Sequence, residues 1–178
     1  MNRRTLLQTL TALVPVAAVS CARAQPGGGP RTAPASAPAV DLPRRPDKLE
    51  KYTAPPETWR QKLSPEAYDI LRGHGTERAF TGAYWDHKAR GIYRCAGCGL
   101  DLYASEDKFD SGTGWPSYTR AVRDSHIVVG VDRSYGMQRD ELRCARCDGH
   151  LGHVFDDGPP PTGKRHCINS AALLFTAG

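Results

Sequence analysis

The sequence predicts a mainly-β domain that carries short helical segments at its N-terminal end. Beyond residue 90, short runs rich in β-branched and aromatic residues alternate with Gly, Asp and Asn, and no helical repeat of useful length interrupts them. Before residue 75, a segment led by a proline has the start and stop signals of a helix. Two Cys-x-x-Cys pairs lie within the β-rich part, where they could cross-link distant segments of the fold.

Residues 1–24 have the features of an export signal rather than of a folded element. They combine a basic start, with Arg3 and Arg4, an apolar stretch over residues 6–19 and small residues after it. The paired arginines followed by Thr-Leu-Leu resemble a twin-arginine export signal. The apolar stretch is shorter than a bilayer requires and Pro15 interrupts it, so we do not expect a comfortable membrane span.

Three outcomes are open for this signal. Ala-Arg-Ala at 22–24 fits a signal-peptidase site, after which the mature chain would begin near Gln25. Residues 18–21 loosely fit a lipoprotein site, in which Cys21 would become a lipidated first residue and tether the protein to a membrane. The signal could also be retained as an anchor. Each outcome places the domain outside the cytoplasm, and we expect the bacterial periplasm.

Residues 25–47 form a spacer rich in Pro, Ala and Gly that cannot bury a core, so the folded domain is expected over residues 48–178. The formal charge of +5 is concentrated ahead of this domain, because residues 1–47 hold six Arg and two Asp. The domain itself holds eighteen Lys and Arg against seventeen Asp and Glu. It lacks the basic surface of a nucleic-acid binder, and we expect no such partner.

The helix and strand candidates of the domain follow from local signals. Ser64, Pro65 and Glu66 supply a helix cap, a first-turn proline and a first-turn acid, and the helix is expected to stop at Gly73. The strand candidates are short apolar or β-branched runs separated by turn residues. They are residues 91–95, 126–132, 141–144, 150–156 and 167–175.

The two Cys-x-x-Cys pairs, Cys95/Cys98 and Cys144/Cys147, are a strong metal signal. Each pair is the right size to hold a metal from a tight turn, and together they supply the four thiolates of a tetrahedral zinc shell. Forty-five residues separate the pairs, so the ion would join two distant parts of one domain. A closed shell leaves no position for a substrate, which predicts one structural zinc ion per chain.

Three other interpretations of these cysteines stay open. Disulfides would suit an exported protein in an oxidising compartment. A redox-active Cys-x-x-Cys motif would usually need a strand before it and the start of a helix after it. Cys144 and Cys147 could also bind a metal together with His150 and His153, which would leave the first pair free.

Cys167 has no obvious partner and is either an inert buried thiol or a nucleophile. Arg165 and His166 precede it, and two histidines lie upstream in GHLGHVFDDGP. Cationic and imidazole groups favour the thiolate, which is the nucleophilic form of cysteine. A Cys–His pair alone would equally suit acyl transfer, as in cysteine proteases, but no orienting third residue or oxyanion motif is visible.

Three blocks of sequence identify a family. They are SGTGWPSY at 111–118, GHLGHVFDDGP at 149–159 and RHCINSAALLF at 165–175. Together they resemble the B-type peptide methionine sulfoxide reductases, and the two Cys-x-x-Cys pairs sit where that family carries its zinc. The resemblance spans roughly residues 50–176. It implies a fold of two antiparallel sheets and the reduction of methionine-R-sulfoxide in peptides and proteins.

The resemblance also implies roles for individual residues. Cys167 matches the catalytic nucleophile, and Trp115 matches the tryptophan against which the methyl group of the substrate packs. The zinc cysteines match a structural metal that is remote from the chemistry. Five more residues match polar groups that line the family's site, namely His150, His153, Asp157, Arg165 and Asn169.

These residue types suit the reduction of a sulfoxide. A thiolate attacks sulfur while the oxygen is protonated and departs as water, which calls for a proton donor and an apolar wall for the S-methyl group. We expect His153, with His150 as the alternative, to donate the proton. Arg165 should lower the pKa of the cysteine by its charge, and Asn169 could fix a water or the histidine. The product on the enzyme is a sulfenic acid, which must be returned to the thiol.

Two positions depart from the family pattern. Many members carry a resolving cysteine where this chain has Thr113, and Cys21 is removed, lipidated or on a tether. We therefore predict a one-cysteine enzyme whose sulfenic acid is reduced by an external thiol, with a thioredoxin-like domain as the expected type of donor. His166 stands where the family usually has Tyr or Phe, and we do not expect it to be catalytic. Its side chain could face outward, or it could alter the local pKa or the fit of the strand.

The sequence leaves two competing functions. One is a zinc-ribbon-like interaction module, although a pure binder does not need Trp115, His153 and Cys167 together. The other is a reductase of the opposite sulfoxide epimer or of free methionine sulfoxide. The preferred prediction is a monomer that repairs oxidised exported proteins and peptides, with no link to a membrane except a lipid or signal anchor.

Overall fold

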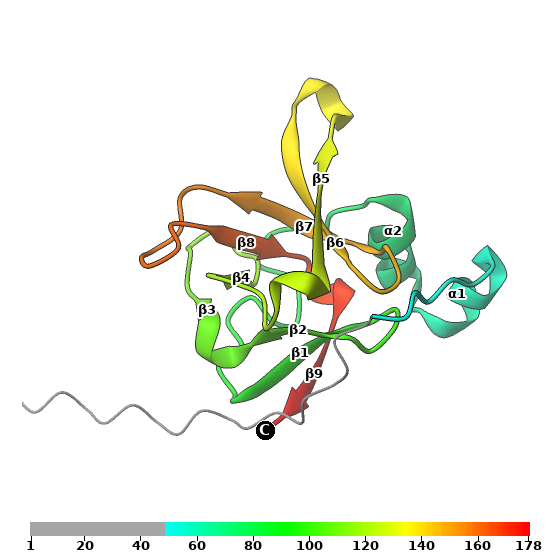
Figure 1. The fold of residues 1–178 in the computed structure, drawn as a ribbon, viewed down its shortest axis with the longest axis horizontal. Coiled ribbons are helices and arrows are strands. Elements are labelled where there is room, and N and C mark those ends of the chain that lie inside the picture. Colours follow the sequence, from blue (N-terminus) through cyan, green and yellow to red (C-terminus); the bar gives the residue numbers. More distant parts are fainter. Residues whose placement is uncertain (1–48) are drawn as a thin grey trace, which may run out of the picture. The chain divides into compact units, whose positions relative to one another are not determined.

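The computed structural model describes residues 49–178, so the predicted export signal and spacer lie outside the described residues. Within that range two α-helices precede a series of short β-strands (Figure 1). The elements are α1 (Pro56–Lys62), α2 (Pro65–Gly73), β1 (Gly91–Cys95), β2 (Asp101–Ala104), η1 (Ser105–Asp107), β3 (Lys108–Phe109), β4 (Ser117–Tyr118), η2 (Asp124–His126), β5 (Ile127–Asp132), η3 (Ser134–Gly136), β6 (Arg139–Cys144), β7 (His150–Phe155), β8 (Arg165–Ile168), η4 (Ser170–Ala172) and β9 (Leu173–Ala177).

Helix α2 begins and ends where the sequence predicts. The Ser64 hydroxyl accepts a hydrogen bond from the backbone N–H of Ala67 at 3.1 Å, and Pro65 occupies the first helical position. The chain leaves the helix through His74, whose φ of 57° is left-handed. Neither α-helix in the described part of the chain is long and apolar enough to cross a membrane.

The strands form two antiparallel sheets, which confirms the predicted fold class. One sheet has three strands in the order β2-β1-β9, and the other has six in the order β3-β4-β8-β7-β6-β5. Figure 1 shows the small sheet below the large one, and the β5–β6 hairpin projecting away from both. Residues from both sheets thus pack into one hydrophobic core.

Three buried tyrosines join the two sheets. The rings of Tyr103, from β2, and Tyr118, from β4, stack with centroids 4.3 Å apart. Tyr93, from β1, meets Tyr118 edge-on at 5.4 Å. His166 approaches the same cluster, with Nδ1 3.2 Å from the Tyr103 hydroxyl. Of the two alternatives for His166, the outward-facing one is therefore wrong, because the pleat that turns Cys167 to one face turns His166 toward the core.

The single strand predicted over residues 167–175 is also wrong. β8 ends at Ile168, a 3-10 turn follows, and β9 then joins the other sheet. No Gly or Pro marks this break. It is stabilised by a distant contact, since Glu77 accepts hydrogen bonds from the backbone of Ser170 and Ala171. In the sequence the apolar residues run on across the break, because both β8, in the large sheet, and β9, in the small one, contribute apolar side chains to the core.

Candidate functional site

The cysteines of the two Cys-x-x-Cys pairs meet at one point. Sγ of Cys95 lies 3.6 Å from Sγ of Cys147, and Sγ of Cys98 lies 3.5 Å from Sγ of Cys144. All four sulfurs lie within 4.8 Å of one another. Sulfurs bound at about 2.3 Å to a tetrahedral zinc ion would be about 3.8 Å apart, so the cluster has the size that such an ion requires.

Two turns of the same type present the two pairs of thiols. The backbone N–H of Gly99 donates to the carbonyl of Cys95 at 2.8 Å, and that of Asp148 donates to the carbonyl of Cys144 at 2.9 Å. Gly99 and Asp148 both have left-handed backbone conformations, with φ values of 73° and 58°. The cysteines of residues 49–178 are all free thiols, so the disulfide interpretation is wrong for this structure. The four cysteines can hold a metal ion, without His150 or His153.

Cys167 lines a separate cavity of about 110 Å³. Its other lining residues are Thr76, Trp115, Arg139, Gly152, His153, Phe155, Ile168 and Asn169. An apolar protein cavity of about 150 Å³ can take a benzene molecule, so this one has room for the methyl sulfoxide end of a side chain. Four of the predicted site residues therefore share one cavity, whereas His150, Asp157 and Arg165 do not line it.

Strand register explains why these side chains meet. His153 on β7 lies directly opposite Cys167 on β8, which in turn lies opposite Ser117 on β4. On the other side, His153 lies opposite Glu141 on β6. Residues that oppose one another in antiparallel strands point to the same face of the sheet. The row therefore places the thiol next to an imidazole on the face away from the tyrosine core.

His153 is held by a carboxylate from the projecting hairpin. Its Nε2–H donates to Asp132 at 2.9 Å, and Arg139 donates to the same carboxylate oxygen at 2.7 Å. Hydrogen bonding by the backbone and then the side chain of Ser134, followed by the hydrogen bond from His153, holds the pKa of Asp132 well below its usual range. An ionised Asp132 only accepts hydrogen bonds, so it fixes the tautomer in which Nε2 of His153 carries a proton.

His150 lies behind His153 rather than in the cavity. Its ring is 2% exposed, and its Nδ1–H donates to Glu141 at 2.7 Å. Burial lowers the pKa of His150, against the opposing hydrogen bond to Glu141. The two imidazoles pack edge to face with centroids 5.3 Å apart. Of the two histidines, only His153 both lines the cavity and lies opposite Cys167.

Arg165 and Asp157 form an ion pair beside the thiol. Nε and Nη2 of Arg165 donate to the two carboxylate oxygens of Asp157 at 2.8 and 2.9 Å. Burial raises the pKa of Cys167 above its ordinary value, while the Arg165 charge and a side-chain hydrogen bond with Thr113 act in the opposite direction. The predicted direction of the Arg165 effect is confirmed. Burial nevertheless outweighs it, so the protonated thiol is favoured in the free protein.

The alkylation rate of Cys167 should report this balance. Because only the thiolate reacts, the rate is expected to rise with pH around a midpoint above that of the unfolded chain. Arg165→Leu removes the opposing charge and should move the midpoint higher still. Iodoacetamide rates across a pH series, with Cys21 replaced by serine, measure both shifts. Lys164→Ala removes a neighbouring exposed cation as the control, and equal midpoints for Arg165→Leu and Lys164→Ala would contradict the electrostatic account.

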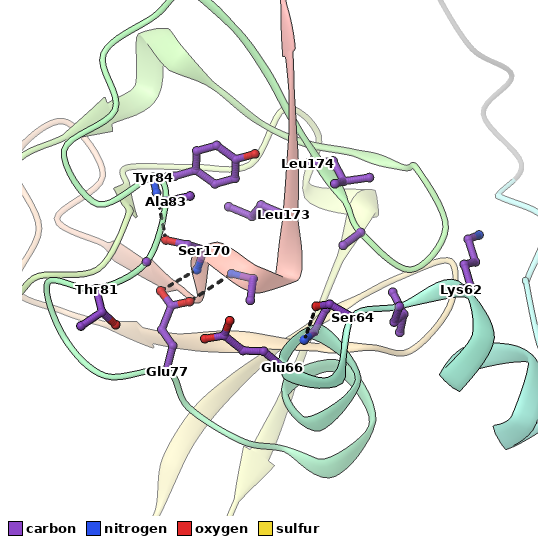
Figure 2. A pocket seen from close by; sticks show the side chains of 15 residues that line it. Lys62, Ser64, Glu66, Glu77, Thr81, Ala83, Tyr84, Ser170, Leu173 and Leu174 are labelled. Atoms are coloured by element: carbon purple, nitrogen blue, oxygen red, sulfur yellow. Dashed lines mark hydrogen bonds between the residues drawn. The ribbon is translucent and has the colours of Figure 1, made fainter.

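Glu77 connects three parts of the site, and Figure 2 shows its carboxylate against the start of η4. Its oxygens accept hydrogen bonds from the backbone N–H groups of Ser170 at 2.7 Å and Ala171 at 3.0 Å. Its own N–H donates to Oδ1 of Asn169 at 3.1 Å, and its carbonyl accepts from Nε1 of Trp115, also at 3.1 Å. Glu77 therefore fixes the position of the cavity tryptophan relative to the end of β8.

Asn169 is bound to the backbone on both sides. Besides accepting from Glu77, its amide donates to the carbonyl of Leu151 at 3.0 Å. Its side-chain hydrogen bonds thus join the segment after α2 to β7, and neither of them involves His153. Sequence reasoning missed Glu77 and Asp132, which lie in no recognisable motif. Glu141 had one usable signal, since Glu and Arg alternate with Leu and Cys in its strand and so occupy the face opposite the core.

Comparison with known proteins agrees with this arrangement. The SelR domain matches residues 63–177. A peptide methionine sulfoxide reductase MsrB from Thiobacillus denitrificans is 62% identical over 117 residues, which cover 66% of this chain and 89% of the relative. MsrB proteins from Synechococcus sp. and Agrobacterium fabrum are 60% and 56% identical over 117 residues, again 66% of this chain and 86% and 87% of the relatives.

The match covers the cysteine cluster, the cavity and all the strands of both sheets. A thiol beside an imidazole, in a cavity with an aromatic wall, is also the equipment that reducing a sulfoxide demands. Proteins with this activity act on oxidised peptides or proteins and draw their electrons from a thiol reductant. The chain belongs to the B-type peptide methionine sulfoxide reductases, the SelR-domain family of oxidoreductases that reduce methionine sulfoxide.

Proposed function

We propose that the protein reduces the R epimer of peptide and protein methionine sulfoxide with Cys167 as the nucleophile. The observation that carries this proposal is the register of β7 and β8, which sets Cys167 opposite His153 in a cavity walled by Trp115. The sulfur of Cys167 attacks the sulfoxide sulfur as the oxygen takes up two protons and departs as water. A water molecule then displaces the substrate sulfur from Cys167 and gives the sulfenic acid. The substrate sulfur gains the electron pair and leaves as methionine.

The neighbours of the thiol divide the work of this step. Nδ1 of His153 passes the proton of the Cys167 thiol to the sulfoxide oxygen, while its Nε2–H stays bound to Asp132, which holds the ring in place. Trp115 and Phe155 supply the apolar wall for the methyl group. The raised pKa of Cys167 means that the free enzyme holds a thiol, and Arg165, paired with Asp157, favours the thiolate when attack occurs. Asn169 and His150 keep the walls of the cavity in position.

The cysteine cluster and the second half of the cycle complete the proposal. A zinc ion held by Cys95, Cys98, Cys144 and Cys147 joins the two sheets and takes no part in the reaction. Two external thiols, which we expect from a thioredoxin-like protein, return the sulfenic acid to the thiol and become a disulfide as water leaves. The basic, apolar start of the chain supports export, so that the enzyme repairs oxidised proteins in the periplasm.

Thr113 stands where a resolving cysteine would act, and its side chain lies close enough to Cys167 to lower the pKa of the thiol. In Thr113→Cys, one equivalent of substrate is therefore expected to give an intramolecular disulfide in place of the sulfenic acid. Mass spectrometry of the non-reduced protein, in a Cys21→Ser background, distinguishes the two products. Thr162→Cys places a thiol on an exposed loop as the control. Persistence of the sulfenic acid in Thr113→Cys would show that the two positions do not meet during turnover.

The decisive experiment supplies the full chain with dithiothreitol and with separated R and S epimers of a peptidyl methionine sulfoxide. Turnover of the R epimer alone is the expected result. Turnover of the S epimer, or of free methionine sulfoxide in preference to the peptide, would overturn the proposed substrate. If a folded, zinc-loaded sample turned over neither epimer, a binding role for the domain would take its place.

A further inference from the structure

A second group of metal-ligating atoms lies behind the cavity, at His74, Glu141 and His150. Oε1 of Glu141 is 2.8 Å from Nδ1 of His74 and 2.7 Å from Nδ1 of His150. All three ligand atoms lie within 4.8 Å of one another, and the group shares no residue with the cysteine cluster. We propose that this group is a second metal site, which binds a divalent transition metal such as Zn²⁺ and thereby inhibits the reductase.

The donor set suits such an ion. Two imidazole nitrogens and one carboxylate oxygen form a three-ligand shell of the kind that leaves a fourth position of zinc open. The side chain of His74 is 60% exposed, whereas that of Glu141 is only 8% exposed. An ion can therefore enter from the His74 side, and water can complete the shell there. Once bound, it touches a carboxylate that is otherwise almost completely shielded from solvent.

The hydrogen bonds of the metal-free state also allow the exchange. At present the two Nδ1–H groups donate to one oxygen of Glu141, and a metal at Nδ1 requires each proton to move to Nε2. Nε2 of His150 is buried and has no hydrogen-bond partner. The change of tautomer therefore breaks no hydrogen bond at that atom. The Glu141 carboxylate exchanges two neutral imidazole N–H donors for one metal cation, which compensates its negative charge.

Inhibition follows from what the three ligands are attached to. His74 ends α2 and begins the segment that carries Glu77, on which the position of Trp115 depends. His150 packs against the ring of His153. A metal ion bound to both His74 and His150 would restrain the Trp115 wall and the His153 wall of the cavity together. It would also fix the His150 ring, which supports His153. We therefore expect slower chemistry with the metal bound, a consequence that rests on the proposed function of the cavity.

Equilibrium dialysis against Zn²⁺ tests the site without any assay of activity. The full chain with Cys21→Ser, loaded with zinc at its cysteine cluster, is expected to bind one further equivalent. His74→Asn should lower the affinity for that equivalent by more than about tenfold, because it removes one ligand while Asn tolerates the left-handed backbone. His87→Gln removes a histidine outside the group and should retain the equivalent, as should Cys167→Ser.

Two results would overturn the site. Loss of the second equivalent in Cys167→Ser would place the ion on the thiol and His153 instead. Equal affinity in His74→Asn and His87→Gln would assign it to adventitious surface binding. Inhibition is then measured in single-turnover reactions without added thiol, since dithiols bind zinc, with each variant compared with its own rate before Zn²⁺ is added. Zn²⁺ should slow the protein with His74 intact and spare His74→Asn, and equal slowing of both would remove the inhibitory role.

Discussion

Cys144→Ser is expected to leave the domain without a cooperative folded state. Cys144 ends β6 in the large sheet, whereas Cys95 ends β1 in the small one, so the cluster joins sheets that are distant in the sequence. Structural zinc contributes on the order of 10–16 kcal/mol in zinc-binding peptides, and a domain is stable by about 5–15 kcal/mol in total. Losing one thiolate of the shell therefore threatens the whole stability of the fold.

Thermal unfolding followed by near-ultraviolet circular dichroism, with metal analysis of the same samples, measures this effect. Cys144→Ser should lose both the transition and the bound zinc. The matched control is Cys21→Ser, which removes a thiol outside the described residues and should keep both. A strong chelator should reproduce the loss in the unmodified chain, and zinc should reverse it. A Cys144→Ser protein that melts like the control would show that the sheets hold together without the metal.

The features that sequence predicts well here are those fixed by neighbouring residues. The cap at Ser64 and the proline at Pro65 define the start of α2 within one turn, and the structure agrees with them. The Cys-x-x-Cys turns are equally local, because each is closed by a backbone hydrogen bond four residues along. Two such turns limit the metal interpretation to very few alternatives, and so the cluster could be assigned before the fold.

The features that sequence could not predict depend on contacts between distant segments. The break after Ile168 is stabilised by Glu77, more than ninety positions earlier in the chain. Asp132 on β5 and His153 on β7 meet across β6, the strand that lies between them in the sheet, and this pairing of three strands cannot be read from the sequence. The pKa of Cys167 is a similar case. Arg165 is visible two residues away in the sequence, but the burial that outweighs its charge appears only after the sheets have packed.

Cys167→Ser is expected to abolish reduction of the sulfoxide while leaving the fold intact. A hydroxyl is a far weaker nucleophile than a thiolate and cannot take the oxygen as a sulfenic acid, so turnover should fall by at least about 10³-fold, the scale seen when other enzymes lose their nucleophile. Serine has nearly the size of cysteine, and its position on β8 keeps its backbone pairing with His153 and Ser117. The melting temperature should therefore match that of the unmodified chain.

This combination separates chemistry from packing, which the loss of activity alone would not do. If Cys167 were an inert core thiol, its replacement would change stability and leave turnover nearly the same. If it is the nucleophile, Cys167→Ser should still bind the sulfoxide peptide, because the wall formed by Trp115 and Phe155 is untouched. If Cys167→Ser is folded, binds the substrate and still turns it over, another thiol must be the nucleophile. Apart from Cys167, Cys21 is the only cysteine of the sequence outside the cluster, so loss of the residual turnover on adding Cys21→Ser would assign the reaction to Cys21.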